Sequence, residues 1–261
     1  MTLLVLSLFA LYIGAGWLVK GSTEIALKAN ISQLVIGLTI VAFGTSAPEL
    51  VVSINASLSG QGDIAIGNVV GSNIFNIAAI LGISATIHPL QAKRQLTKID
   101  IPILLLATIL LTVLFWNGEL GRLEGALFLL GIILYTLFSL YFSRKHEKKI
   151  EEQNGELEKQ PDPWYKDVLY ILGGLAVLIF ASHLLITNAV SIAKEVGVSE
   201  AVIGLTLVAA GTSLPEMATS VVAALKKNPD IAIGNIVGSN LFNILAIAGT
   251  SSVIQPIIAK I

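Results

Sequence analysis

Long apolar runs alternate with short polar stretches along almost the whole chain. A helix that crosses a bilayer needs about 20 predominantly apolar residues. The runs of suitable length are residues 2–20, 33–59, 63–87, 99–117, 122–143, 167–189, 200–225 and 230–254. Lipid offers no hydrogen-bond partner to an open sheet edge, so each run is expected to form a helix. The pattern therefore predicts an all-α integral membrane protein with eight transmembrane helices.

Four of these eight runs are interrupted by polar and helix-breaking residues. The second, third, seventh and eighth runs carry Gly, Pro, Ser or Asn near their middles. Irregular backbone at that depth is tolerated where it faces protein or a cavity instead of lipid. These four helices are therefore predicted to be broken around a polar centre.

The polar interruptions occur twice with the same spacing. Residues 44–49 are GTSAPE and residues 211–216 are GTSLPE, and GNxxGSNxFN follows in each half. A shift of 167 positions superposes the two copies without a gap, and 27 of the 42 pairs from position 35 to position 76 are identical. One duplicated unit was therefore the ancestor of both halves.

A charged segment, residues 144–166, separates the two halves. It is rich in Lys and Glu and contains Pro161 and Pro163, which predicts a solvated linker that is partly helical or disordered. The first repeat, residues 1–143, holds five predicted spans, and the second, residues 167–261, holds three. Because five is odd, the second repeat is expected to enter the membrane inverted relative to the first.

Composition and charge support this membrane assignment and exclude several classes of protein. The chain is 54% apolar and 13% charged, with a mean hydropathy of +0.83, which exceeds what a soluble domain buries. A net charge of -1 argues against nucleic-acid binding, and the lack of cysteine excludes disulfides and thiolate metal sites. With eight spans, all of the 16 Lys and Arg except Arg122, Lys194 and Lys260 fall on one side. Basic residues mark the cytoplasmic side of a cell or inner membrane, so the linker is predicted to be cytoplasmic and the N-terminus outside.

Two acidic residues, Glu49 and Glu216, lie in the middle of predicted spans. A charge at that depth costs about 2.5–3.5 kcal/mol on insertion scales, so an intramembrane carboxylate suggests function. Ser46 and Ser213 stand three residues before them, which also fits a helix-capping box. However, a neutral Gln would cap equally well, and two facing carboxylates repel each other unless a cation lies between them. The pair therefore predicts a cation site.

Further oxygen ligands lie around each glutamate at helical spacing. Thr45 is four residues from Glu49, and Ser72 is four residues from Asn76 in the next span. The full candidate set is Thr45, Ser46, Glu49, Ser72 and Asn76, their equivalents Thr212, Ser213, Glu216, Ser239 and Asn243, and the backbone carbonyls of Ala42 and Ala209, which helix breaks at Gly44 and Gly211 would free. Oxygen ligands without nitrogen or sulfur favour Na⁺, Ca²⁺ or Mg²⁺, and a flexible site of six or more oxygens suits Ca²⁺ better than Mg²⁺.

Some of these polar residues have a second interpretation. Ser72, Asn76, Ser239 and Asn243 could instead join neighbouring helices by hydrogen bonds. The remaining asparagines of the motif are predicted to satisfy broken backbone; they are Asn68, Asn73, Asn235 and Asn240. The glycines Gly67, Gly71, Gly234 and Gly238 are predicted to allow close approach of helices.

GTSAPE and GTSLPE, each followed by GNxxGSNxFN, resemble the two alpha-repeats of the sodium/calcium exchanger superfamily, most closely its prokaryotic branch. The resemblance covers residues 33–84 and 200–251. It implies ten spans, a diamond of ion sites between the second, third, seventh and eighth helices, and alternating access by sliding of the first and sixth helices. It further implies that Glu49 and Glu216 bind Ca²⁺ and share in Na⁺ binding, that the hydroxyl and Asn positions complete the sites, and that no prosthetic group is needed.

Two departures from the family pattern change what is expected. Potassium-dependent exchangers carry Asp at the position of Asn243, so K⁺ is expected to be neither required nor transported. Two further spans would follow Ile254, yet the sequence stops at Ile261. We expect a truncated chain rather than evolutionary loss of two helices, and a truncated chain could fold without transporting.

The resulting hypothesis is an antiporter, not an enzyme, that exchanges Na⁺ for Ca²⁺ across the bilayer. A proton/calcium exchanger that uses Glu protonation is the nearest alternative, and a channel is another, since broken helices also build selectivity filters. An intramembrane hydrolase would need a base for Ser46 or Ser213, and His183 is the one histidine within a predicted span. The position aligned with His183 in the first repeat is Gly16, so the duplication does not support such a pair.

Overall fold

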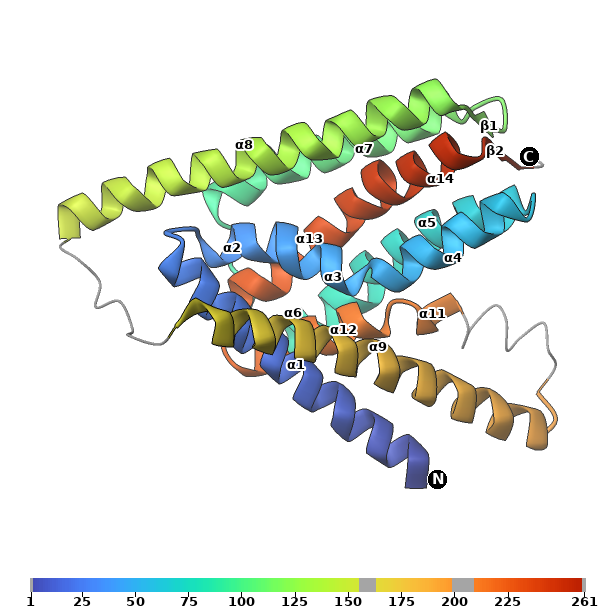
Figure 1. Cartoon of the computed structure of the whole chain (residues 1–261), viewed down its shortest axis with the longest axis horizontal. Coiled ribbons are helices and arrows are strands. Elements are labelled where there is room, and N and C mark those ends of the chain that lie inside the picture. Colours follow the sequence, from blue (N-terminus) through green and yellow to red (C-terminus); the bar gives the residue numbers. More distant parts are fainter. Residues whose placement is uncertain (1, 155–162, 199–208, 260–261) are drawn as a thin grey trace.

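A computed structural model describes residues 2–154, 163–198 and 209–259 (Figure 1). The first repeat consists of α1 (Thr2–Lys28), α2 (Gln33–Ile36), the π-helical turn η1 (Gly37–Val41), α3 (Ala42–Thr45), α4 (Ala47–Leu58), α5 (Gly62–Phe75), the π-helical turn η2 (Asn76–Leu81), α6 (Gly82–Ile87), the π-helical turn η3 (Leu96–Asp100), α7 (Ile101–Leu114), β1 (Glu119–Leu120) and α8 (Arg122–Asn154). The second repeat consists of α9 (Trp164–Glu195), α11 (Ala209–Gly211), α12 (Leu214–Leu225), α13 (Pro229–Phe242), the π-helical turn η5 (Asn243–Ile247), α14 (Ala248–Ile254) and β2 (Ile257–Ile258).

The duplication is visible in the backbone as well as in the sequence. Helices α4 and α12 begin and end at equivalent positions, and α5 and α13 both end where a π-helical turn begins, at Asn76 and Asn243. Ser46 and Ser213 adopt nearly the same conformation, with φ/ψ of -84°/9° and -88°/10°. The two copies of the motif therefore fold alike, although they lie in different surroundings.

The predicted helical membrane architecture is confirmed, but the count of eight spans is not. Among the described residues, six helices are long and apolar enough to cross a bilayer. A seventh span is formed by the pair Gln33–Thr45 and Ala47–Leu58, which is bent by 49°. Within the seventh predicted run, residues 200–208 lie outside the described residues, and α12 alone is a shorter apolar helix. The eighth span therefore stays a prediction.

Several helices are longer than the apolar runs that predicted them. Helix α1 continues to Lys28, and α8 continues through Asn154, well into the segment assigned to the linker. Lys, Glu, Gln and Arg are good helix formers, so a helix need not stop where its apolar run stops. The length of an apolar run thus predicts the part of a helix that lies in the bilayer, but it underestimates the full length of the helix.

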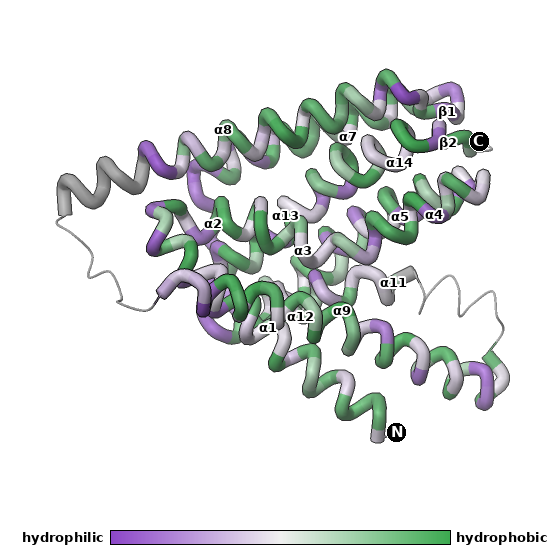
Figure 2. The backbone as a smooth tube through the Cα atoms, in the orientation of Figure 1, coloured by the Kyte–Doolittle hydropathy of each residue, from purple (hydrophilic) through white to green (hydrophobic). Residues whose placement is uncertain are grey.

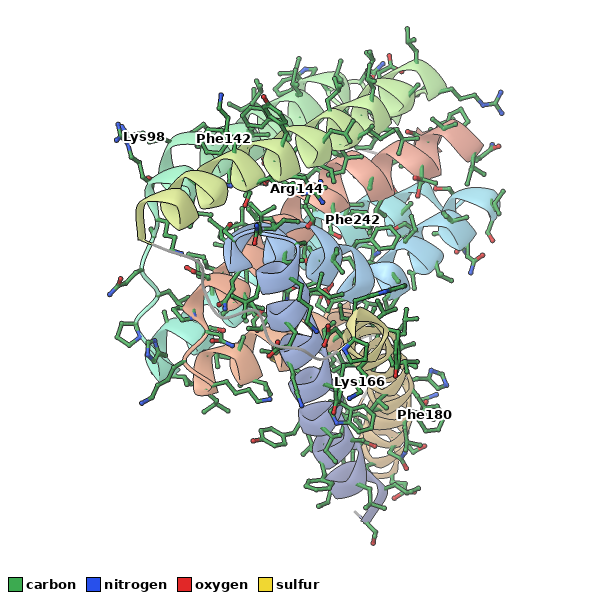
Figure 3. The ribbon with its side chains drawn as sticks, turned by 60° about the vertical axis from the view of Figure 1, so that its left-hand side comes forward. Lys98, Phe142, Arg144, Lys166, Phe180 and Phe242 are labelled. Carbon is green, nitrogen blue, oxygen red and sulfur yellow. The ribbon has the colours of Figure 1, made fainter. Side chains whose placement is uncertain are left out.

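Helices α13 and α14 form the centre of the molecule. In the candidate span Pro229–Ile254 every residue from Ile231 to Gly249 is buried, whereas only 28% of the most apolar 18-residue stretch of its counterpart Gly62–Ile87 is buried. Figure 1 shows α7 and α8 along one side of this central helix and α1 crossing α9 on the other. Elsewhere the outer helices expose apolar side chains, as membrane-facing helices do. Figure 2 shows that most residues of α7 and the N-terminal part of α8 are hydrophobic, and Figure 3 shows Phe180, which is 70% exposed, pointing outward from α9.

Helices α1 and α9 cross with their backbones in close contact. A Cβ built on Gly174 would lie 2.7 Å from the carbonyl oxygen of Gly14, so the two backbones touch where both residues lack a side chain. At the end of this crossing, Lys28 Nζ lies 2.5 Å from Asp167 Oδ2. In a membrane the hydrophobic effect does not drive helices together, so their contact depends on close packing. Small residues are the usual means of such packing.

A two-residue antiparallel strand pair was not predicted. Glu119 pairs with Ile258, and Leu120 pairs with Ile257, beside the C-terminal end of the described chain. Strands this short lack a periodic apolar pattern, so sequence alone provides no signal for them. The pair joins the α7–α8 loop to the segment after α14.

A buried polar pair joins η3, which directly precedes α7, to α8. The hydroxyl of Tyr135 donates to Asp100 Oδ1 at 3.0 Å, and Asp100 is 1% exposed with no partner for its Oδ2 among the described residues. We expect Tyr135→Phe to lower the free energy of unfolding by about 1–3 kcal/mol, because it strands a buried acceptor. The measurement is thermal or denaturant unfolding of the purified protein in detergent. Tyr141 is 68% exposed, so Tyr141→Phe serves as the matched control, and equal stability of the two variants would contradict the expectation.

Candidate cation site

The two glutamates meet at the centre of the protein, each held by a serine of the other repeat. Ser46 Oγ donates to Glu216 Oε1 at 2.7 Å, and Ser213 Oγ donates to Glu49 Oε1 at 2.9 Å. Both glutamates are 1% exposed, and both serines are fully buried. Neither serine caps its own helix with its side chain, so the capping-box interpretation is wrong. The hydroxyls cross the repeat boundary instead.

The helix break that creates this arrangement lies at Ser46, two residues later than the predicted break at Gly44. Pro48 has no N–H to donate to the carbonyl four residues earlier, that of Gly44, and its ring clashes with this carbonyl, so the helix is interrupted just before the proline and begins again at Ala47. The carbonyl of Ala42 still accepts the Ser46 N–H at 3.0 Å, so the break does not release it from the helix. A carbonyl has a second lone pair, and Ala42 therefore stays a candidate ligand. Ala209 begins α11, directly after residues 199–208, which lie outside the described part of the chain.

Six buried side-chain oxygens of the predicted set have no hydrogen-bond partner within the described structure. They are Glu49 Oε2, Glu216 Oε2, Ser72 Oγ, Ser239 Oγ, Asn76 Oδ1 and Asn243 Oδ1. They form three pairs related by the sequence repeat, and each parent residue is at most 3% exposed. A buried polar oxygen without a partner costs about 1–3 kcal/mol, so six of them strongly favour a bound cation. The alternative that Ser72 and Ser239 join helices through their hydroxyls lacks support here.

The threonines of the motif differ from the serines. Thr45 is fully buried, and its hydroxyl lies 3.1 Å from Asn235 Oδ1 and 3.3 Å from the Ala42 carbonyl. Thr212, its equivalent, is half-buried in the turn that precedes α12 and also has an interaction partner. Both threonines therefore have partners within the protein, and an ion that used Thr45 would compete with its present hydrogen bonds.

Four asparagines of the motif were predicted to satisfy backbone groups rather than bind an ion, and two of them, Asn68 and Asn235, do bond to backbone carbonyls. Asn68 Nδ2 donates to the Glu49 carbonyl at 3.1 Å and to Ser53 Oγ at 2.8 Å. Asn235 Nδ2 makes the same two contacts one repeat later, to the Glu216 carbonyl at 3.3 Å and to Ser220 Oγ at 2.9 Å. Each of them fastens a glutamate-bearing helix to the helix that follows.

The other two asparagines make contacts that the sequence analysis missed. Asn73 and Asn240 accept hydrogen bonds from the side chains of Asn243 and Asn76, both at 2.9 Å. Their only sequence signal is recurrence within the motif, which does not distinguish them from Asn68 and Asn235. The tertiary structure alone connects them to the candidate ligands.

The charge of the site is not compensated by protein. No described Lys or Arg pairs with Glu49 or Glu216, and the ion pairs between described residues are Lys28 with Asp167 and Lys93 with Asp230. Two carboxylates in a low-dielectric interior need opposite charge or protons to be stable. The site therefore has charge and ligands for cations, and its oxygens come from side chains of both repeats.

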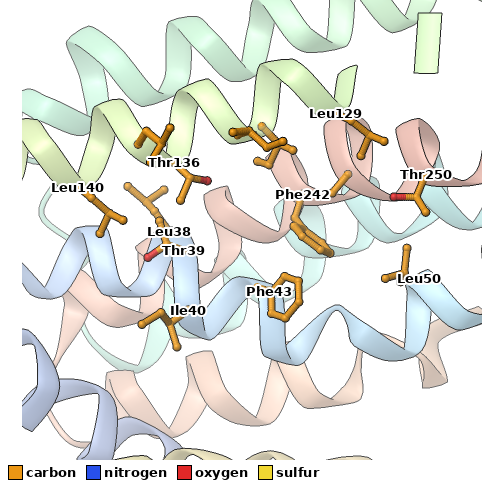
Figure 4. Close-up of a pocket in the computed structure, with 14 residues that line it drawn as sticks. Leu38, Thr39, Ile40, Phe43, Leu50, Leu129, Thr136, Leu140, Phe242 and Thr250 are labelled. Atoms are coloured by element: carbon orange, nitrogen blue, oxygen red, sulfur yellow. The ribbon is translucent and has the colours of Figure 1, made fainter. Parts of the chain in front are cut away.

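An apolar pocket of about 570 Å³ lies beside the site but is not part of it (Figure 4). Its lining runs from α3 and α8 to η5 and includes Phe43 and Phe242, whose rings meet edge to face with centroids 5.1 Å apart. Phe43 precedes Gly44 in the first motif, and Phe242 precedes Asn243 in the second. The lining is mostly hydrocarbon and contains no charged residue; its polar side chains are Thr39, Thr136 and Thr250, so the pocket is poorly suited to an ion.

The arrangement does not support hydrolase chemistry at the motif serines. Both hydroxyls donate to carboxylates of the opposite repeat, whereas His183 is an exposed residue of α9. A serine nucleophile needs a base within hydrogen-bond reach that is itself oriented by a third group. The Ser–Glu pairs lack this third group, and they are duplicated in a way that suits ion binding.

Comparison with known proteins identifies the family of the chain. The sequence profile described as sodium/calcium exchanger protein matches residues 1–141 and 166–261. A putative antiporter, CaxA from Alkalimonas amylolytica, is 43% identical over 242 residues, which cover 91% of this chain and 75% of the relative. The sodium/calcium exchanger MaX1 from Methanosarcina acetivorans is 34% identical over 290 residues, covering 98% of this chain and 83% of the relative. The solved structure of the sodium-calcium exchanger NCX_Mj, soaked with Na⁺ and Ca²⁺, superposes with a TM-score of 0.83 at 32% identity, covering 98% of this chain and 82% of the other.

Proposed function

The chain belongs to the sodium/calcium exchanger family, and from this membership we propose that it is an antiporter that moves Ca²⁺ out of the cytoplasm in exchange for Na⁺. One observation carries the proposal. Two buried glutamates from opposite repeats are each held through one oxygen by the other repeat's serine, and each keeps its second oxygen unpartnered. Four further unpartnered oxygens from Ser and Asn complete a set that suits Na⁺ and Ca²⁺.

Mutual exclusion follows from the charge of this site. Two carboxylates supply about two negative charges, which one Ca²⁺ or a set of Na⁺ ions neutralises. Loading both kinds of ion together would place excess positive charge in a low-dielectric interior, where unit charges interact far more strongly than in water. We infer that the protein occludes its ions, and changes the side of the membrane to which the site is open, only when the charge of the site is neutralised.

Sodium fits the site better than a proton as the coupling ion. A proton needs only a carboxylate oxygen, whereas the unpartnered Ser and Asn oxygens would remain unsatisfied in a protonated site. Sodium ions would be coordinated by these Ser and Asn oxygens. Asn243 is neutral where potassium-dependent exchangers carry Asp, so we further propose that K⁺ is neither required nor transported.

The proposed orientation of the chain in the membrane rests on the distribution of its basic residues. Lys and Arg concentrate on the side of residues 144–166, from which we infer that this segment is cytoplasmic and that the N-terminus is outside. The ion gradients set the direction of exchange, and an inward Na⁺ gradient would drive Ca²⁺ out of the cell.

The test is radiolabelled Ca²⁺ uptake into proteoliposomes under separate ion gradients. We expect uptake when Na⁺ is loaded inside and removed outside, no uptake from a pH gradient alone, and no change when K⁺ is omitted. Uptake driven by the pH gradient would establish proton coupling instead. Downhill Ca²⁺ flux that ignores the Na⁺ gradient would indicate a channel, and no flux at all would show that this chain folds without transporting.

A further inference from the structure

Four asparagines form two amide–amide hydrogen bonds that cross between the repeats. Asn76 Nδ2 donates to Asn240 Oδ1, and Asn243 Nδ2 donates to Asn73 Oδ1, both at 2.9 Å. Within each bond the donor is a candidate ligand, and the acceptor stands three residues earlier in the motif of the opposite repeat. The two bonds are therefore equivalent under the internal duplication.

The direction of these bonds decides what the ligand amides present to an ion. A primary amide has a donor end and an acceptor end, and using the nitrogen elsewhere leaves the oxygen available. The Oδ1 atoms of Asn76 and Asn243 are buried and unpartnered among the described residues, as are the second carboxylate oxygens of Glu49 and Glu216. With either amide turned around, N–H groups would face the cation and repel it. An acceptor at positions 73 and 240 is what prevents this turn.

The backbone strengthens the same arrangement. The N–H of Asn76 donates to the carbonyls of Ser72 and Asn73 where η2 begins, and the N–H of Asn243 donates to those of Ser239 and Asn240 where η5 begins. Asn73 Nδ2 donates to the Asn240 carbonyl at 3.3 Å, which links the two acceptor residues directly. π-Helical turns are rare and concentrate at functional sites. Here they begin at the two residues whose amides must be oriented.

We propose that Asn73 and Asn240 are positioning residues that orient the Asn243 and Asn76 amides with their oxygens toward the transported cation. The proposal rests on the proposed cation site, but not on which ion drives transport. Asn73 and Asn240 act through hydrogen bonds to the ligands and need not touch the ion. The affinity for Ca²⁺ is thus determined in part by two residues outside the set of ligands.

The test compares an acceptor-free substitution with one that keeps the acceptor. In Asn240→Leu the Asn76 nitrogen loses its partner, and we expect the half-saturating Ca²⁺ concentration to rise about tenfold, which corresponds to the loss of one hydrogen bond to an ion ligand. In Asn240→Asp a carboxylate accepts the same bond and adds a negative charge near the cation, so we expect the half-saturating concentration to stay at or below that of the wild type. Uptake at saturating Ca²⁺ should be retained in Asn240→Leu, which changes no charge. Asn73→Leu and Asn73→Asp should repeat the pattern through Asn243.

A control separates positioning from general damage. Asn188 donates to the Leu184 carbonyl within α9 at 2.7 Å, away from the site, so Asn188→Leu should leave the half-saturating concentration unchanged. Should Asn240→Leu fail to fold, Asn73→Leu provides the same test, because Asn73 is only half-buried. Equal impairment in the Leu and Asp variants, or an unchanged half-saturating concentration in the Leu variants, would overturn the proposal.

Thermal stabilisation by Ca²⁺ gives a second measurement that does not require transport. A ligand that binds the folded state stabilises it by an amount that rises with the logarithm of its concentration relative to its dissociation constant, and the melting temperature rises accordingly. The Ca²⁺ concentration needed for a given rise should increase about tenfold in Asn240→Leu and not in Asn240→Asp. If the wild type binds Ca²⁺ but shows no Na⁺-driven uptake, the proposed function fails while the positioning role is still tested.

Discussion

Glu49→Gln is expected to lower Na⁺-gradient-driven Ca²⁺ uptake by about 100-fold or more. Gln retains the shape of the side chain and still accepts the hydrogen bond from Ser213 through its oxygen, so the change removes charge and little else. With one carboxylate left, a bound Ca²⁺ would leave a net positive charge in the membrane interior. Glu216→Gln should behave in the same way, because Ser46 holds Glu216 as Ser213 holds Glu49.

Stability measurements make this first prediction specific. Without Ca²⁺, Glu49→Gln should melt at a higher temperature than the wild type, since it removes one of two uncompensated buried charges. Added Ca²⁺ should stabilise the wild type and not the variant. The matched control is Glu119→Gln, which removes an exposed carboxylate on β1 and should change neither uptake nor melting. Unchanged uptake in either Glu49→Gln or Glu216→Gln would remove that residue from the site.

The second large effect concerns the crossing of α1 and α9. A Cβ on Gly174 would lie 2.7 Å from both the Gly14 carbonyl oxygen and the Leu18 nitrogen. Both are backbone atoms, so the clash cannot be relieved by a rotamer change, and the helices must separate. We expect Gly174→Ala to lower the free energy of unfolding by about 1–3 kcal/mol. The readout is the melting temperature in detergent together with Ca²⁺ uptake.

The neighbouring glycine provides the control for this substitution. A Cβ on Gly173 would lie 3.7 Å from the nearest atom, which belongs to the Trp17 ring and is at an ordinary contact distance. Gly173→Ala has the same chemistry and the same gain in helix propensity one residue away, and it should be tolerated. If Gly174→Ala and Gly173→Ala have the same melting temperature, close backbone contact is not what joins the two helices.

The sequence was a reliable guide where the relevant information is local. Apolar runs of bilayer length predicted helices that the structure contains, because each span satisfies its own backbone hydrogen bonds. The run that includes residues 200–208 is the exception, since part of it lies outside the described residues. The identity of the candidate ligands was also accessible, because duplication repeats them in register. The break was placed two residues early because Gly44 drew the prediction, whereas Pro48 determines the turn at Ser46.

By itself, the sequence determined that the chain is a duplicated membrane protein with one carboxylate and a set of oxygen ligands in each half. Only the tertiary structure decided how the halves join: that Ser46 binds Glu216, that Ser213 binds Glu49, and that two asparagines orient two others. The physical reason is distance along the chain. Helical periodicity and composition are set by neighbours within a few turns, whereas these contacts join residues 164 or 170 positions apart and exist only once the two repeats have packed together.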